Sequence, residues 1–200
     1  GGPAKACARS RAHSVEELQN RTTQILTEAL EEADARDAAR LACRALLYEV
    51  ATTRTPGLVD RDNSGSHKDM DVFTFLDSAS ALWPYFESCT RTGRQTAALP
   101  ATDTFQALRK AGQKAEADML AATRGVNTHK GAIFTLGLIC GAVGRLWRAE
   151  APCREPEAIL SECARMAAPS VRSHFSALDG ESARTAGQKL YLEQGLTGAR

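Results

Sequence analysis

The sequence predicts an all-α fold, a multi-helix bundle around a buried, glycine-rich central helix. Apolar residues recur at helical spacing in most segments of the 200-residue chain. We find no segment with the alternation of apolar and polar residues that a half-buried strand requires. Alanine, the residue with the highest helix propensity, is frequent in the periodic segments. Together these observations indicate helices joined by loops.

The N-terminal part of the chain predicts two helices. The first begins at a capping box, in which Ser14 and Glu17 can each satisfy the other's backbone N–H group. It runs as far as the acidic residues at 31–37, which interrupt the apolar pattern and indicate a junction. The second helix is expected over 35–53, because Pro56 disfavours helical backbone at the residue before it.

Two helices are expected in the middle of the chain. Residues 71–87 carry a wide apolar face that is typical of a well-buried helix, and Pro84 should kink or end it. Residues 91–100 are expected to form a loop. Another helix follows over about 102–123 and ends before Gly125, a residue typical of helix C-termini.

The central helix is expected over 130–150, with Thr128 as its N-cap. Glycine inside a helix costs about 1 kcal/mol relative to alanine. The close approach of another backbone is the simplest reason for the three glycines on one side of this helix, which are Gly137, Gly141 and Gly144.

The C-terminal part predicts a helix over 155–167 that Pro169 stops. Shorter helices are expected at 170–178 and 183–194.

Composition and charge exclude several classes of function. The formal net charge is +1, whereas general binding to nucleic acid requires a strong basic excess on one face. The most apolar segment, 133–147, is too short to span a bilayer, so we expect no membrane association. The six cysteines form no C-x-x-C pair, so we interpret them as reduced thiols of a cytoplasmic protein rather than zinc ligands.

Two polar loops interrupt the helices and are expected to face each other across a cleft. Residues 55–71 hold four aspartates, an arginine, a lysine and His67 among two glycines and a proline. Residues 125–131 contain a second His-Lys pair where the central helix begins. Charged loops on a helical scaffold are typical carriers of binding or catalytic groups.

The start of the central helix is the clearest candidate for an anion site. The first amides of a helix have no helical partner, and the helix dipole favours negative charge there. Asn127, Thr128, His129 and Lys130 lie at this position, and Lys130 and His129 can add positive charge. The alternative is an ordinary Asn or Thr cap beside a solvated lysine.

Carboxylates near both loops suggest further chemistry. Asp60, Asp62 and Asp69 could hold Mg²⁺ through oxygen ligands, although such residues also simply form turns. Glu116 and Asp118 precede the second loop, and one of them could point into the cleft. The alternative for this pair is a solvated helix face.

Several long motifs, in the same order, resemble the triphosphoribosyl-dephospho-CoA synthase family over about residues 38–200. The motifs are Pro56-Gly-Leu-Val-Asp60, Gly65-Ser-His-Lys-Asp-Met70, Ala115-Glu-Ala-Asp-Met119, Ala122-Thr-Arg-Gly-Val-Asn-Thr-His-Lys-Gly131, Thr185-Ala-Gly-Gln-Lys-Leu-Tyr191 and Gly195-Leu-Thr-Gly-Ala-Arg200.

This resemblance implies a transferase that joins the triphosphoribosyl part of ATP to 3′-dephospho-CoA and releases adenine, with the cleft binding the nucleotide. Mg²⁺ on Asp60 and Asp69 would neutralise the triphosphate, and His67, Asp69 or Glu116 would act in catalysis. The expected phosphate ligands are Arg61, Lys68, Asn127, Thr128, His129, Lys130 and Arg200. Members of the family continue beyond the position of Arg200, which implies that more residues complete the site.

A second, shorter resemblance concerns Cys7–His13 and Glu17–Arg21, which are similar to the C-terminal tail of apo-citrate-lyase phosphoribosyl-dephospho-CoA transferase. It implies a fusion, with residues 1–33 as the tail of that enzyme and 34–200 as the synthase domain. The product would then serve the acyl carrier protein of citrate lyase.

Two other functions remain open at this stage. One is a non-catalytic, α-helical nucleotide-binding fragment. The other is a metal-dependent phosphohydrolase, which requires more metal-ligating histidines than the chain supplies with His13, His67, His129 and His174.

Overall fold

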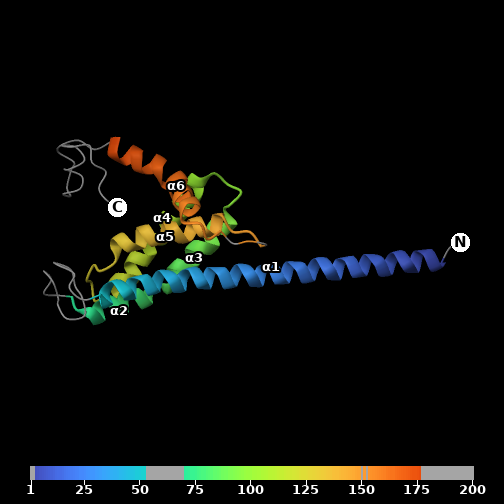
Figure 1. Ribbon diagram of the computed structural model, residues 1–200, viewed down its shortest axis with the longest axis horizontal. Coiled ribbons are helices and arrows are strands. Elements are labelled where there is room, and N and C mark those ends of the chain that lie inside the picture. The colour runs from blue at the N-terminus through green and yellow to red at the C-terminus, as the bar shows by residue number, and fades with distance from the viewer. Residues whose placement is uncertain (1–2, 53–69, 150, 152, 177–200) are drawn as a thin grey trace.

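The computed structural model describes residues 3–52, 70–149, 151 and 153–176. Within these residues all regular structure is helical, and the predicted all-α class is confirmed. Figure 1 shows one long helix along the base of a compact group of shorter ones. The helices are α1 (Pro3–Ala51), α2 (Val72–Ala81), α3 (Trp83–Gln95), α4 (Ala101–Ala122), α5 (Lys130–Arg145) and α6 (Pro156–Ser176).

Helix α1 is continuous, so the predicted junction at 31–37 and the start at Ser14 are wrong. No glycine or proline occurs between Ala4 and Ala51, and acidic residues change the exposed face of a helix without breaking it. Glu32 instead forms a bidentate ion pair with Arg91 of α3. The division at 33/34 falls inside this helix and stays a prediction.

Only the second half of α1 packs on the bundle. Ala35, Ala39, Leu46 and other small or aliphatic residues are buried on one face. The first half extends beyond the other helices (Figure 1), and Ile25 is among its exposed apolar side chains.

The helix is interrupted at Leu82, between α2 and α3, as expected from Pro84. Proline is tolerated in the first turn of a helix, where its missing N–H has no helical partner, and Pro84 occupies that position in α3. The loop predicted over 91–100 is partly wrong, because α3 continues to Gln95. Gly93 lies in this last turn and packs directly against the Gly141 carbonyl of α5.

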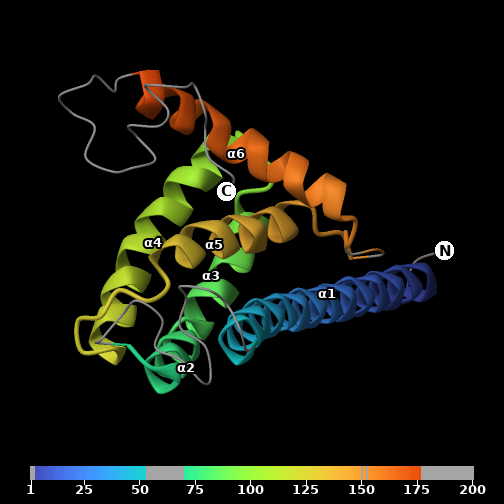
Figure 2. The same ribbon diagram turned by 60° about the vertical axis from the view of Figure 1, so that its left-hand side comes forward.

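Helix α5 contacts α1, α3, α4 and α6, and Figure 2 shows it between α3 and α4. The expected backbone approach occurs at Gly144, where an added Cβ would overlap the Thr90 carbonyl of α3. At Gly137 and Gly141 an added Cβ would overlap side chains, those of Tyr85 and Leu108, although the Gly141 carbonyl itself packs against Gly93.

Two predicted helix ends differ from the structure. Helix α5 ends at Arg145 rather than near 150. Helix α6 passes through Pro169, which was expected to stop it, so 155–167 and the first part of 170–178 form one helix. The helix predicted over 183–194 lies outside the described residues.

A buried ion pair joins the C-terminal end of α5 to α6. Arg145 Nε donates to Glu162 Oε1 at 2.6 Å, and the two side chains are 5% and 4% exposed. The guanidinium also donates to the Thr96 and Leu99 carbonyls and to the Thr104 hydroxyl. Burial alone would raise the pKa of Glu162, but the hydrogen bonds and charges of its arginine partners keep it below its ordinary value.

The remaining core is apolar, with Leu82, Phe86, Met119 and Met166 fully buried. The described cysteines are free thiols, as predicted, and burial raises the pKa of Cys89 to about 12. None of the described helices is both long enough and apolar enough to cross a membrane.

Candidate functional site

The turn between α4 and α5 has the backbone expected around Gly125. Arg124 and Gly125 adopt positive φ angles of 57° and 91°, and the Gly125 N–H donates to the Leu120 carbonyl to close α4. The Asn127 side-chain oxygen accepts from the Lys130 N–H at 3.4 Å. Thr128 does not cap α5 as predicted, because its hydroxyl donates to Ser78 of α2 at 2.7 Å.

His129 is held in the interior between α2 and α4. Its Nδ1 lies 2.6 Å from the Ser78 hydroxyl, its ring meets the Phe75 ring edge-to-face at 5.1 Å, and its backbone N–H faces the Met119 sulfur. Since Ser78 accepts from Thr128, its own proton is free to donate to Nδ1, which places the imidazole proton on Nε2.

Burial lowers the pKa of His129 to about 4, so the imidazole is neutral at neutral pH. The positive charge expected from this residue is therefore absent. Among the described residues Nε2 has no hydrogen-bond partner. A role for His129 in substrate binding stays a prediction, and the group it would offer is a buried, neutral N–H donor.

The pH dependence of stability should report the burial of His129. Its pKa is about 4 in the folded chain and near 6.5 in the unfolded chain, so the unfolded chain binds more protons between these values. The contribution of the buried, neutral His129 to the free energy of unfolding should be fully present above pH 6.5. The free energy of unfolding should then fall by up to about 3 kcal/mol as the pH is lowered to 4. Urea unfolding across this range measures the slope, and His129→Gln should remove most of it. An equal slope in the variant would contradict the prediction.

Lys130 and Glu116 form the charged part of the site. The Lys130 ammonium lies 2.6 Å from a Glu116 carboxylate oxygen, and the two side chains are 60% and 34% exposed. Of the two candidate carboxylates on α4, Glu116 therefore faces the start of α5, whereas Asp118 pairs with Lys114 on the exposed side. Both members of the Glu116–Lys130 pair remain open to a ligand.

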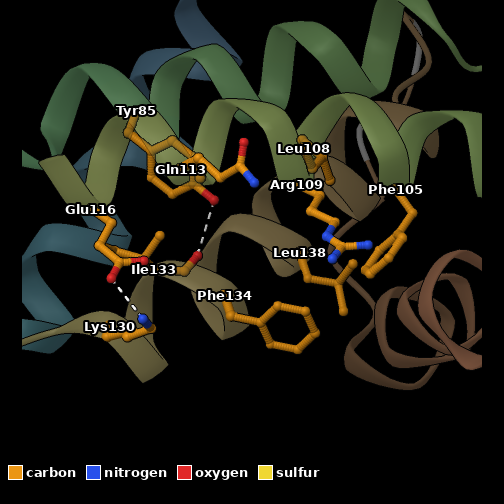
Figure 3. A pocket seen from close by; sticks show the side chains of 11 residues that line it. Tyr85, Phe105, Leu108, Arg109, Gln113, Glu116, Lys130, Ile133, Phe134 and Leu138 are labelled. Carbon is orange, nitrogen blue, oxygen red and sulfur yellow. Dashed lines mark hydrogen bonds and ion pairs between the residues drawn. The ribbon is translucent and has the colours of Figure 1, made fainter. Parts of the chain in front are cut away.

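A pocket of about 390 Å³ adjoins this ion pair. In Figure 3 Glu116 and Lys130 lie at one end and Phe105 at the other, with Phe134 between them. The Tyr85 hydroxyl donates to the Ile133 carbonyl at 3.0 Å. The pocket is lined by Tyr85, Phe105, Leu108, Arg109, Gly112, Gln113, Glu116, Lys130, Ile133, Phe134 and Leu138.

Sequence reasoning missed most of this pocket. Phe105, Arg109, Gln113 and Glu116 share one stripe of α4 at helical spacing, so the pattern was available. The polar members could not be distinguished from an ordinary solvated edge without knowing that α5 packs beside them.

The first loop lies largely outside the described residues. This applies to Asp60, Asp62, Arg61, His67, Lys68 and Asp69, and also to Arg200. Asp71 is described, and it caps α2 by accepting the Thr74 N–H at 2.9 Å. One turn later Phe75 contacts His129, so the helix that follows the first loop packs directly on the second. Groups of three or more metal-ligating side chains do not occur in the described part of the chain.

Comparison with known proteins decides the family. The family model described as CitG: ATP:dephospho-CoA triphosphoribosyl transferase matches residues 35–200. The chain belongs to this family. Its match includes both polar loops and the pocket between α4 and α5.

Relatives of the CitG family carry the corresponding name. A probable 2-(5''-triphosphoribosyl)-3'-dephosphocoenzyme-A synthase of Albidiferax ferrireducens is 44% identical over 161 residues, or 80% of this chain and 52% of that protein. The synthase of Haemophilus ducreyi is 38% identical over 209 residues, covering 98% of this chain and 64% of that protein.

A probable synthase of Vibrio cholerae is 44% identical over 166 residues, covering 80% of this chain and 51% of that protein. The chain thus spans about half the length of several curated relatives that it matches. No solved structure matches it. The fused transferase and a truncated site stay predictions.

Proposed function

We propose that this chain transfers the triphosphoribosyl group of ATP to 3′-dephospho-CoA and releases adenine. The observation that carries the proposal is the Glu116–Lys130 pair at the start of α5, beside a pocket large enough for part of a nucleotide. Family membership and the names of the relatives support the same reaction. The product would serve the acyl carrier protein of citrate lyase, and the use of ATP suits a cytoplasmic enzyme.

The start of α5 would bind the triphosphate. The first turn of a helix offers amide groups that have no helical partner, and its dipole favours an anion. An added Cβ at Gly131 would meet no atom within 4 Å, so this turn is open to a ligand. Lys130 supplies the positive charge, and Asn127 orders the turn through its contact with the Lys130 N–H.

The reaction requires a new C–O bond and the loss of a C–N bond. The 2′-hydroxyl of dephospho-CoA attacks C1′ of the ATP ribose, its proton passes to a base, and adenine leaves with the C1′–N9 electron pair and takes up one proton. Glu116 is the candidate base in the described part of the site, and His67 is the alternative outside it. A phosphate that replaces Glu116 as the ion-pair partner of Lys130 would leave the Glu116 carboxylate free for this role.

Asp60 and Asp69 are the proposed ligands of Mg²⁺, which would supply charge neutralisation to the triphosphate when bound. Arg61, Lys68 and Arg200 are proposed as further phosphate ligands. All of these residues lie outside the described part of the chain. The roles assigned to Lys130 and Glu116 do not depend on the ion.

The direct test is the appearance of free adenine from ATP. Chromatography of the reaction should show adenine only when 3′-dephospho-CoA is present. Free phosphate or pyrophosphate in place of adenine would identify a phosphohydrolase. ATP binding without adenine release would identify the chain as a nucleotide-binding fragment and contradict the proposed activity.

A further inference from the structure

We infer that the pocket between α4 and α5 binds the adenine base of the ATP substrate. This inference rests on the proposed function and extends it to a specific part of the nucleotide. The pocket volume of about 390 Å³ falls within the range of small-molecule sites, roughly 300–1,000 Å³.

The polarity of the pocket matches a nucleotide that lies along α5. Lys130 and Glu116 stand at one end, where the helix amides favour phosphate. Phe134 follows one turn later, about 6 Å along the helix axis at about 1.5 Å per residue. A triphosphate at Lys130 therefore leaves the ribose near Glu116 and the base near Phe134, which is the order the reaction requires.

Phe134 provides an exposed aromatic face for the base. Phe134 is 51% exposed although it lines the pocket, so a ligand can cover surface that the protein leaves in water. Phe105 meets it edge-to-face, with ring centroids 6.2 Å apart at 83°, and supports the ring from the end of the pocket opposite Lys130. A base stacked on Phe134 would gain contacts that every purine can make.

Gln113 and Arg109 add polar groups on the α4 wall of the pocket (Figure 3). A glutamine carboxamide can donate and accept at the same time, which suits the adjacent N6 amino group and N7 of adenine. Arg109 donates only, so it can pair with a ring nitrogen of the base.

The second substrate, 3′-dephospho-CoA, also carries an adenine, joined to a flexible arm. The adenine that binds in the pocket can therefore come from either substrate. We favour ATP, because its base is bonded directly to the reacting C1′ carbon, and Glu116, the candidate general base for the attacking hydroxyl, borders the same pocket. The experiment must therefore compare the two substrates.

The test compares Phe134→Ala with Phe73→Ala. Phe73 is 68% exposed on α2 and does not line the pocket, so it is a matched control for the loss of a surface phenylalanine. Calorimetry would measure binding of ATP, of ribose 5-triphosphate, which lacks the base, and of 3′-dephospho-CoA. Far-ultraviolet circular dichroism and urea unfolding would verify that both variants fold.

Phe134→Ala should weaken ATP binding by roughly five- to one hundred-fold, as expected for the loss of one stacked base. Binding of ribose 5-triphosphate should not change, and Phe73→Ala should leave all three ligands unaffected. Unchanged ATP binding in Phe134→Ala, or weaker binding of 3′-dephospho-CoA alone, would overturn the inference. Because this test measures binding, its result can be interpreted even if the adenine-release assay detects no activity.

Discussion

Replacing Glu162 with alanine is expected to lower the free energy of unfolding by about 3–5 kcal/mol. The substitution leaves the guanidinium of Arg145 buried with its charge uncompensated. Removing one partner of a buried pair costs more than the pair contributes, because the remaining charge cannot return to water. The hydrogen bonds from Arg145 to Thr96 and Leu99 satisfy only part of its donors. Urea unfolding followed by circular dichroism measures the loss.

The exposed pair of Lys114 and Asp118 provides the control. Its atoms are 2.7 Å apart, nearly as close as those of the buried pair, but both side chains face water. Asp118→Ala should therefore cost no more than about 1 kcal/mol. Combining Arg145→Met with Glu162→Leu should recover much of the lost stability, since it removes both buried charges. Equal losses for Asp118→Ala and Glu162→Ala would show that burial of the pair is unimportant.

Replacing Lys130 with alanine is expected to reduce kcat/KM for adenine release by about 10²–10³-fold. Lys130 is the cation at the start of α5 and borders the pocket. Its positive charge would stabilise the negative charge of the triphosphate at the helix N-terminus, and the helix dipole there also stabilises negative charge. Initial rates at varied ATP and fixed 3′-dephospho-CoA measure the effect.

A matched control separates this role from a general charge effect. Lys114→Ala removes a lysine of α4 that also pairs with a carboxylate but does not border the pocket, so its rate should stay near wild type. Lys130→Arg should retain part of the activity. If the double variant Lys130→Met with Glu116→Gln regained wild-type rates, Lys130 would only neutralise Glu116. Both the phosphate role of Lys130 and the role of Glu116 as base would then be wrong.

The helical class of the fold could be predicted because periodicity and alanine content act locally. The errors arose where tertiary contacts decide. Acidic residues at 31–37 predict a break, yet Glu32 pairs with Arg91, which lies 59 positions later in the sequence on another helix. Pro169 was expected to end a helix, but α6 continues through it. Pro84 was interpreted correctly because proline near a helix start follows a local rule.

The site was predictable in part for the same reason. The helix start at Lys130 follows from local sequence, and its contact with Glu116 agrees with the expectation that a carboxylate of α4 points toward this loop. The interior position of His129 depends on Ser78 and Phe75, which precede it by about fifty residues. Sequence patterns carry no direct signal for such a contact, so they predict positive charge at His129, where the structure has a buried neutral imidazole.

Helix α5 carries its two polar functions at opposite ends. Its 16 residues span about 24 Å, with Lys130 at the first turn and Arg145 at the last. Substitutions this far apart generally have independent effects on free energy. A chain weakened at Arg145 should thus become temperature-sensitive while its affinity for nucleotide at low temperature stays intact. Thermal tolerance and ligand recognition can therefore vary separately within a single helix.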